Sequence, residues 1–310
     1  MSTVLFTHPA CLDHDTGDYH PECADRLRAV MAALEGEEFA NLYREEAPLA
    51  TSEQILRVHS RDYLELVGDN APAAGQLYHL DPDTVLSGGS WEAALRAAGA
   101  VVAGVDGVLD GSYRNVFCAV RPPGHHAGAG FGMGFCVFNN VAIGALQARV
   151  VHGVERIAAI DLDVHHGNGT QDIFFADSGL FYASIHQSGA FPGTGLAGET
   201  GVAGNILNIP MPAGTASGPW RAAVDEVILP RLRAFAPQLI LVSMGFDAHA
   251  ADPMAHMRLT TADYHWVTNR LCEIAAERCA NRLVSVLEGG YDLRALAMSS
   301  AAHVRALMGF

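Results

Sequence analysis

The feature that most constrains this chain is a regular alternation of short apolar runs with longer stretches of helical periodicity. Runs such as IAAI and LILVS are apolar at consecutive positions, which is typical of strands covered on both faces. Strands that alternate with helices favour βα units around a mostly parallel sheet. The expected strands are Thr3–Thr7, Asn115–Val120, Arg156–Val164, Leu180–Ile185, Ile206–Pro210, Leu239–Met244 and Leu283–Leu287.

Helical periodicity occupies the segments between or after these strands. The expected helices are Ser52–Val67, Ser90–Leu109, Val137–Val150, Ser217–Phe235, Thr261–Cys279 and Asp292–Leu307. No internal repeat, low-complexity tract or Pro/Gly/Ser-rich linker divides the 310 residues. We therefore predict an α/β fold with a single domain over residues 1–310, in which helices flank both faces of a mostly parallel central sheet.

Composition limits the location and the partners. No uninterrupted apolar run of about 18 residues occurs, and the first residues lack the basic and apolar regions of a secretory signal. The six cysteines form no CxxC pair, so we expect buried free thiols and a cytoplasmic location. A formal net charge of −15 argues against a broad basic surface for nucleic acid. We expect no direct nucleic-acid binding and no membrane association, and a homo-oligomer stays open.

Polar clusters follow three of the apolar runs, and open parallel sheets bind ligands beyond the carboxyl ends of their strands. DLDVHHGN carries Asp161, Asp163 and His165, GFDAHAADP carries Asp247, and EGGY carries Tyr291. Asp163, His165 and Asp247 together make an O/N/O set of three ligands. Such a set leaves a coordination position free for water, as catalytic zinc sites do. Ligand identity leaves Zn²⁺ and Fe²⁺ both open.

Two adjacent histidines, His125 and His126, lie among prolines and glycines in the segment RPPGHHA. A histidine near its usual pKa can take a proton from water and return it to a leaving amine. Asp161 and Asn168 are candidates to orient the two rings through hydrogen bonds. The hydroxyl of Tyr291 can stabilise a tetrahedral oxyanion. Each feature alone has a structural explanation, but their joint occurrence at successive strand ends indicates a metal-assisted hydrolase.

Seven longer motifs occur in a fixed order between HPECADRL near residue 20 and EGGYDL near residue 290. They are RPPGHHA, GFCVFNN, DLDVHHGNGTQDIF, SIHQ, FPGTG, GFDAHAADP and EGGY. In these motifs the chain resembles the histone deacetylase family, in the class II-like branch that contains bacterial histone deacetylase-like amidohydrolases and acetylpolyamine amidohydrolases. The resemblance implies the arginase/deacetylase type of α/β fold. It also implies a zinc-dependent amidohydrolase that removes acetyl groups from an acetylated amine or peptide.

The resemblance assigns roles to the polar clusters. It implies that Zn²⁺ is held by the O/N/O set named above, and that His126 is the general base and acid with His125 as its electrostatic partner. It pairs His125 with Asp161 and His126 with Asn168. It implies that Tyr291 hydrogen-bonds the substrate carbonyl. Arg26 resembles, more loosely, an arginine linked to a channel for acetate release.

The resemblance also describes a substrate tunnel. Phe135 and Phe191 match its aromatic walls, and Gly134 matches the backbone acceptor for the N–H on the amine side of the substrate. Polyamine-selective relatives carry a gatekeeper Glu two residues after the Asp of the Asp-Pro pair, and this chain has Met254 there, after Asp252. Acidic residues of another loop offer a substitute for that Glu, namely Asp13, Asp15 and Asp18.

Structural K⁺ or Na⁺ ions are a further implication of the resemblance. One cation would be wrapped by Asp161, Ser184 and the carbonyls of Asp163, His165 and Ile185. A second cation would be held by carbonyls around Phe174, Asp177 and Leu180.

Three other functions remain as alternatives. An acetylpolyamine deacetylase would share the same machinery. An arginase-like ureohydrolase with two Mn²⁺ ions needs further bridging carboxylates. No Asp stands two residues after His165, and in the motif GFDAHAADP alanines stand where further ligands would be needed, at Ala250 and Ala251. A catalytically silent acetyl-group binding protein would need neither a metal nor a base, so the intact set of site residues argues against it.

Overall fold

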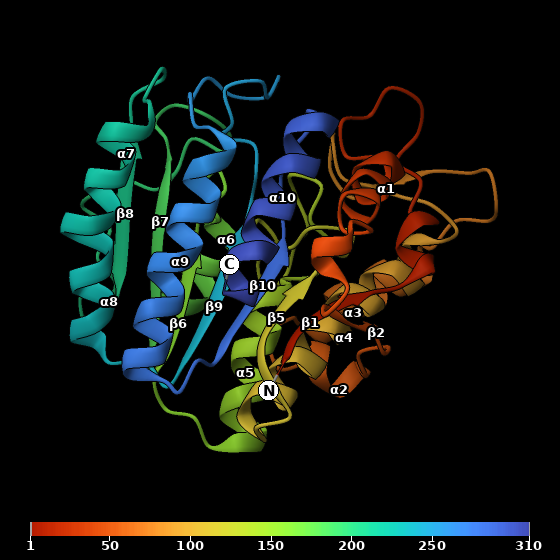
Figure 1. Ribbon diagram of the computed structural model, residues 1–310. Helices are drawn as coiled ribbons and strands as arrows, with labels where there is room; N and C mark the ends of the chain where they lie inside the picture. The colour runs from red at the N-terminus through yellow and green to blue at the C-terminus, as the bar shows by residue number, and fades with distance from the viewer. Residues whose placement is uncertain (1, 310) are drawn as a thin grey trace.

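The computed structural model describes residues 2–309, and within them one sheet of eight strands is paired in parallel throughout (Figure 1). Its strand order is β2 (Tyr43–Glu46), β1 (Ser2–Thr7), β5 (Tyr113–Cys118), β10 (Leu283–Leu287), β9 (Leu239–Met244), β6 (Ile157–Asp161), β7 (Leu180–Gln187) and β8 (Ile206–Met211). A small antiparallel ladder pairs β3 (Tyr78–His79) with β4 (Val85–Leu86).

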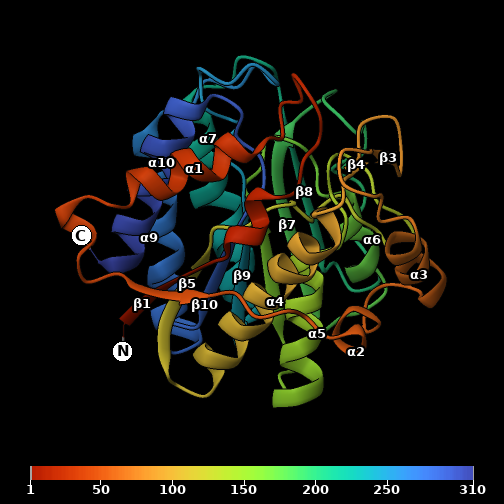
Figure 2. The same cartoon turned by 90° about the vertical axis from the view of Figure 1, so that its right-hand side faces the viewer.

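Helices cover both faces of the sheet. They are α1 (Ala24–Ala33), α2 (Ser52–Ile55), α3 (Arg61–Asp69), α4 (Ser90–Leu109), α5 (Asn140–His152), α6 (Asn168–Phe174), α7 (Ser217–Ala223), α8 (Leu229–Phe235), α9 (Thr261–Arg278) and α10 (Leu293–Met308). In Figure 2 the sheet lies between α1, α9 and α10 on one side and α4 and α5 on the other. Strands β6, β7, β9 and β10 are therefore buried at every position, as their apolar sequences require. The predicted fold class is confirmed.

Local hydrogen bonds explain where the helices differ from the predicted ones. The helix expected over Ser52–Val67 is two helices, because the backbone N–H of Ser60 donates to Ala129 O at 2.7 Å and the Ser60 hydroxyl caps α3. The stretch Ser217–Phe235 is helical throughout, but a π-helical turn joins α7 to α8. Helices α1 and α6 and strand β2 were not predicted. The sequence YREE of β2 is polar, as an edge strand can be.

The order of the three central strands positions the polar motifs. Strand β9 lies between β10 and β6, with Leu287 of β10 opposite Met244 of β9, and Ser243 opposite Asp161 of β6. Because these strands are parallel, the loops that follow their carboxyl ends all leave the same edge of the sheet. The segments DLDVHHGN, GFDAHAADP and EGGY therefore meet there.

Two further sequence expectations concern thiols and membranes. All six cysteines lie within the described residues and are free thiols. Within residues 2–309, no helix combines the length and apolar character needed to cross a membrane.

The buried histidine of α10 makes stability depend on pH. The Nδ1 atom of His303 lies 2.7 Å from Thr268 Oγ1 and the Nε2 atom lies 2.7 Å from Ser285 Oγ. Burial lowers the pKa of His303 to about 3. Below pH 6.5 the unfolded chain therefore takes up a proton that the folded chain excludes. Stability is then lost at about 1.4 kcal/mol per pH unit as pH falls from about 6.5 toward the folded pKa.

Denaturant unfolding of the wild type and of His303→Gln at pH 6.5, 5.5 and 4.5 measures this loss. Chelator in every sample removes any contribution from metal release. As pH falls, we expect the free energy of unfolding to decrease more steeply for the wild type than for the variant. The difference in slope should approach about 1.4 kcal/mol per pH unit, because unfolding of the wild type takes up one more proton. Parallel curves for the two proteins would contradict the prediction.

Candidate active site

Two carboxylates and one imidazole converge at the sheet edge from the loops after β6 and β9. The ligand atoms of Asp163, His165 and Asp247 lie within 4.8 Å of one another. The Nδ1 atom of His165 is 3.0 Å from Asp163 Oδ1 and 3.1 Å from Asp247 Oδ2. Backbone donors fix both acids: Gly289 N donates to Asp163 Oδ2 at 2.8 Å, and Val164 N donates to Asp247 Oδ1 at 2.9 Å. The structure thus brings the three predicted ligands together.

The electrostatics of this trio fit a divalent cation. Burial, and then the neighbouring charge of Asp163, raise the pKa of Asp247 to about 7. Burial opposes a charge on His165, but Asp163 and Asp247 outweigh it and raise the pKa of His165 well above its usual value. Two buried carboxylates that repel each other are relieved by a cation between them. An O/N/O donor set of this kind suits Zn²⁺ or Fe²⁺.

The paired histidines differ in their partners and in their protonation. His126 Nδ1 donates to Asn168 Oδ1 at 2.9 Å, which leaves Nε2 of His126 unprotonated. His125 Nδ1 donates to Asp161 Oδ2 at 3.0 Å. Burial and then the charge of His125 lower the pKa of His126 well below its usual value. Burial opposes a charge on His125, but Asp161 and Asp163 raise its pKa to about 10. These shifts leave the His126 ring neutral, with Nε2 able to accept a proton, and favour a protonated His125 ring.

A narrow cavity of about 160 Å³ leads to these groups. It is lined by Asp83, His126, Gly134, Phe135, His165, Phe191, Met254 and Tyr291. The Phe191 ring centroid lies 5.1 Å from that of His126, and the Phe135 centroid lies 5.9 Å from that of Tyr291. Gly134 has φ +56°, and an added Cβ there would lie 2.5 Å from His126 Cδ2, so only glycine fits. The predicted tunnel residues all line this one cavity.

Tyr291 is held by contacts to its backbone and its ring. Its backbone N–H donates to Asp252 Oδ2 at 2.7 Å, and the guanidinium carbon of Arg26 lies 4.9 Å from its ring centroid. Arg26 also donates from Nε to Gly290 O at 2.7 Å. Burial raises the pKa of Tyr291 well above 10, so the group stays a hydroxyl donor. Arg26 and Asp252 thus support the tyrosine, whereas the sequence analysis used Asp252 only to locate Met254.

Asp83 is a cavity residue that the sequence analysis missed. It lies in the loop between β3 and β4, and its Oδ1 is buried without a hydrogen-bond partner among the described residues. His20 holds this loop, with Nε2 3.1 Å from Asp83 O and its ring centroid 4.8 Å from that of Phe135. In the sequence, the acidic motif DPDT was the feature that could have drawn attention to Asp83. By contrast, the acidic residues suggested as gatekeeper substitutes line a different cavity, namely Asp13, Asp15 and Asp18.

The residues proposed for monovalent cations also come together. Asp161 and Ser184 face each other across β6 and β7. The carbonyls of the second group converge on Asn205 Nδ2, which donates to Phe174 O at 3.0 Å, Asp177 O at 3.1 Å and Leu180 O at 2.9 Å. A carbonyl oxygen has two lone pairs, so these bonds leave acceptor capacity for a cation. Both monovalent cation sites stay predictions.

Known proteins are similar to this chain in sequence and fold. The Histone deacetylase domain model matches residues 20–307. Histone deacetylase 14, chloroplastic, of Arabidopsis thaliana is 40% identical, over 99% of this chain and 77% of its own. The histone deacetylase-like amidohydrolase of Pseudomonas aeruginosa is 38% identical, over 94% of this chain and 82% of its own. The crystal structure of the HDA15 HD domain matches with a TM-score of 0.93 at 33% identity, over 99% of this chain and 88% of that one. The chain belongs to the histone deacetylase family.

Proposed function

We propose that this protein is a zinc-dependent amidohydrolase that removes an acetyl group from an acetylated amine. Membership of the family already supports a deacetylase or amidohydrolase. The observation that carries the finer proposal is the cavity, because His126, Tyr291 and His165 of the O/N/O cluster all line its walls. A carbonyl that enters it meets a base, a hydroxyl donor and a metal-ligand set together.

The residues divide the reaction between them. Zinc held by Asp163, His165 and Asp247 would supply a Lewis acid that polarises the carbonyl and acidifies a bound water. His126 takes the proton of the attacking water at Nε2, because its Nδ1 is already committed to Asn168. The Tyr291 hydroxyl donates to the oxyanion as it forms on the former carbonyl oxygen. The imidazole pair then returns a proton to the departing amine, which releases acetate and a free amine.

The cavity favours a slim, linear substrate. Its walls are the rings of Phe135 and Phe191, and its volume of about 160 Å³ suits an alkyl chain with one acetamide group. Met254 provides no carboxylate for the far end of a polyamine. We therefore favour acetyl-lysine in a peptide, or a small acetylated amine. Oδ1 of Asp83 has no hydrogen-bond partner within residues 2–309, so it can accept from an N–H or ammonium group. This observation supports the second candidate, an acetylpolyamine.

Metal content and acetate release test this proposal. We expect one zinc ion per chain, and acetate release from an acetyl-lysine peptide that a chelator abolishes and added Zn²⁺ restores. N-acetylputrescine in parallel decides the substrate class through kcat/KM. Full activity in metal-free protein would contradict the zinc mechanism, and a large preference for N-acetylputrescine would establish the polyamine alternative.

Two broader proposals accompany this function. We propose that one catalytic domain spans residues 1–310. We also propose a cytoplasmic location, since six free thiols suit a reducing compartment.

A further inference from the structure

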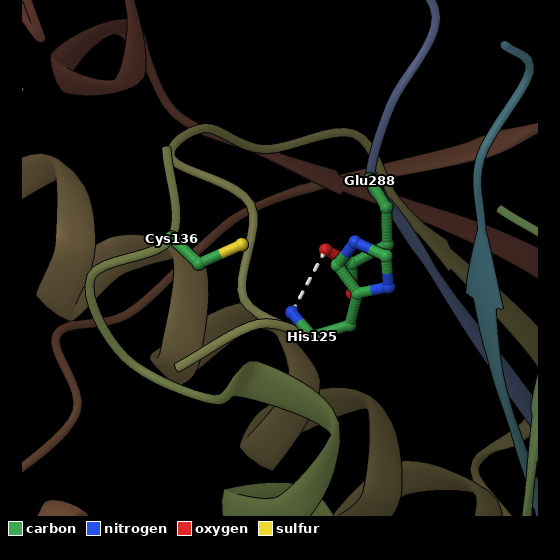
Figure 3. Close-up of side chains that lie close together, drawn as sticks. All are labelled: His125, Cys136 and Glu288. Atoms are coloured by element: carbon green, nitrogen blue, oxygen red, sulfur yellow. Dashed lines mark hydrogen bonds between the residues drawn. The ribbon is translucent and has the colours of Figure 1, made fainter. Parts of the chain in front are cut away.

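Glu288 is a fully buried carboxylate beside the paired histidines that the reaction described above does not use. It follows β10 directly, and Figure 3 shows it facing His125 and the sulfur of Cys136. Its Oε2 accepts from Gly124 N at 2.7 Å and from His125 N at 3.2 Å. Its Oε1 accepts from Ser243 Oγ at 3.1 Å. All three partners are donors, which an ionised carboxylate matches.

The hydrogen bonds to Glu288 hold the backbone of the turn that carries the His125 and His126 rings. Glu288 accepts from two consecutive N–H groups of the turn, and Cys136 Sγ accepts from the third, His126 N, at 3.5 Å. The partners of the two rings come from elsewhere, at the end of β6 and the start of α6. The rings therefore keep their partners only if the turn stays at a fixed distance from β6. Glu288 links the turn to the neighbouring ends of β10 and β9 and so sets that distance.

The side chains of His125, Cys136 and Glu288 do not form a second metal site. Ligand atoms of His125, Cys136 and Glu288 lie close enough together for an ion. However, Nδ1 of His125 is committed to Asp161. Burial raises the pKa of the Cys136 thiol well above its usual value, so this side chain is a neutral thiol and not a thiolate ligand. The arrangement is thus a hydrogen-bonded clamp.

We propose that Glu288 is a positioning residue for deacetylation, which holds the Gly124–His125 turn so that His126 keeps its alignment with Asn168 and the cavity. This inference rests on the proposed function of the site. Removal of the acceptor leaves two buried N–H groups unpaired and lets the turn move. A shift of about 1 Å in a catalytic group can lower the rate about 10²-fold.

Two variants separate the role of Glu288 as a hydrogen-bond acceptor from the role of its negative charge. Glu288→Gln can accept from both N–H groups through Oε1 and can donate to Ser243, whereas Glu288→Ala accepts nothing. We expect Glu288→Ala to lower kcat about 10²-fold with KM and zinc content unchanged, and Glu288→Gln to stay within about tenfold of the wild type.

Asp263 provides the matched control, since it is equally buried and accepts from Thr260 N and Ser217 Oγ, both at 2.7 Å. It is not among the residues that line the cavity. Asp263→Asn should lower the melting temperature and leave kcat per zinc-loaded chain unchanged. A glutamine variant as slow as the alanine variant would overturn the proposal. So would an alanine variant with the kcat of the wild type.

Ring signals of the histidines give a readout that does not depend on activity. In protein with ¹⁵N-labelled histidine, the signals of His125 and His126 should shift or broaden in Glu288→Ala and stay in place in Glu288→Gln and Asp263→Asn. If the wild type released no acetate from any substrate, the proposed function would fail while this measurement still tested the clamp. Unchanged ring signals in folded Glu288→Ala would refute the clamp itself.

Discussion

Replacing His126 by alanine is expected to lower kcat for acetate release about 10³-fold while the protein keeps its zinc. His126 is the histidine of the pair that lines the cavity, and its bond to Asn168 leaves Nε2 free to accept a proton. The depressed pKa of His126, caused by burial and then by the charge of His125, keeps the ring neutral near pH 7. Loss of the ring removes the base but none of the three metal ligands.

The measurement is kcat with an acetyl-lysine peptide, alongside zinc content for each preparation. His152→Ala is the control, because His152 Nε2 lies 2.7 Å from the partly exposed carboxylate of Asp106 and the residue does not line the cavity. That variant should match the wild type. A His126→Ala enzyme that works within threefold of the wild type would assign the base to another group. Loss of zinc together with activity would mean that the ring supports the metal site.

Replacing Tyr291 by phenylalanine should lower kcat by about 10²- to 10³-fold, the usual effect of losing one oxyanion donor. Burial raises the pKa of Tyr291 well above 10, so the wild-type group is a protonated donor at every working pH. The ring itself remains, and with it the packing against Phe135 and Arg26. We therefore expect the melting temperature, the zinc content and KM to change little.

Tyr264 offers a matched control for this substitution. It is also a buried tyrosine, and its hydroxyl has no hydrogen-bond partner among the described residues, but it does not line the cavity. Tyr264→Phe should leave kcat unchanged. Equal activity of Tyr291→Phe and the wild type would show that the oxyanion does not need this hydroxyl. A rise in KM with an unchanged kcat would instead show that the hydroxyl contributes to binding of the substrate ground state.

Much of the site could be predicted because its chemistry is encoded locally. Asp163 and His165 stand two residues apart after a strand, and Tyr291 follows a Gly-Gly turn, so residue type and strand position were enough to select them. Asp83 and Glu288 could not be selected in this way. The segment DPDT around Asp83 predicts only a turn. Glu288 stands in the motif EGGY, but its hydrogen bonds reach the backbone of residues more than 160 positions away.

Strand order was likewise beyond the reach of local periodicity. The segments that form β6, β9 and β10 are all short apolar runs, and their composition does not predict that β9 lies between the other two. That order depends on which helices cover which face and on how their side chains pack. The same holds for the break at Ser60, where a partner from a distant loop, Ala129 O, takes the backbone N–H.

Neighbouring residues were therefore enough to predict the fold class, the family and the residue types of the proposed metal and catalytic groups, because alternating apolar runs and ordered motifs are local properties. The resemblance had assigned the proton-accepting role to His126, but only the tertiary structure shows that this ring lines the cavity and that Glu288 accepts hydrogen bonds from the backbone of its turn. Those properties depend on distances between segments that are remote in the chain. Burial and the charges of His125, Asp161 and Asp163 then separate the pKa values of the two adjacent rings.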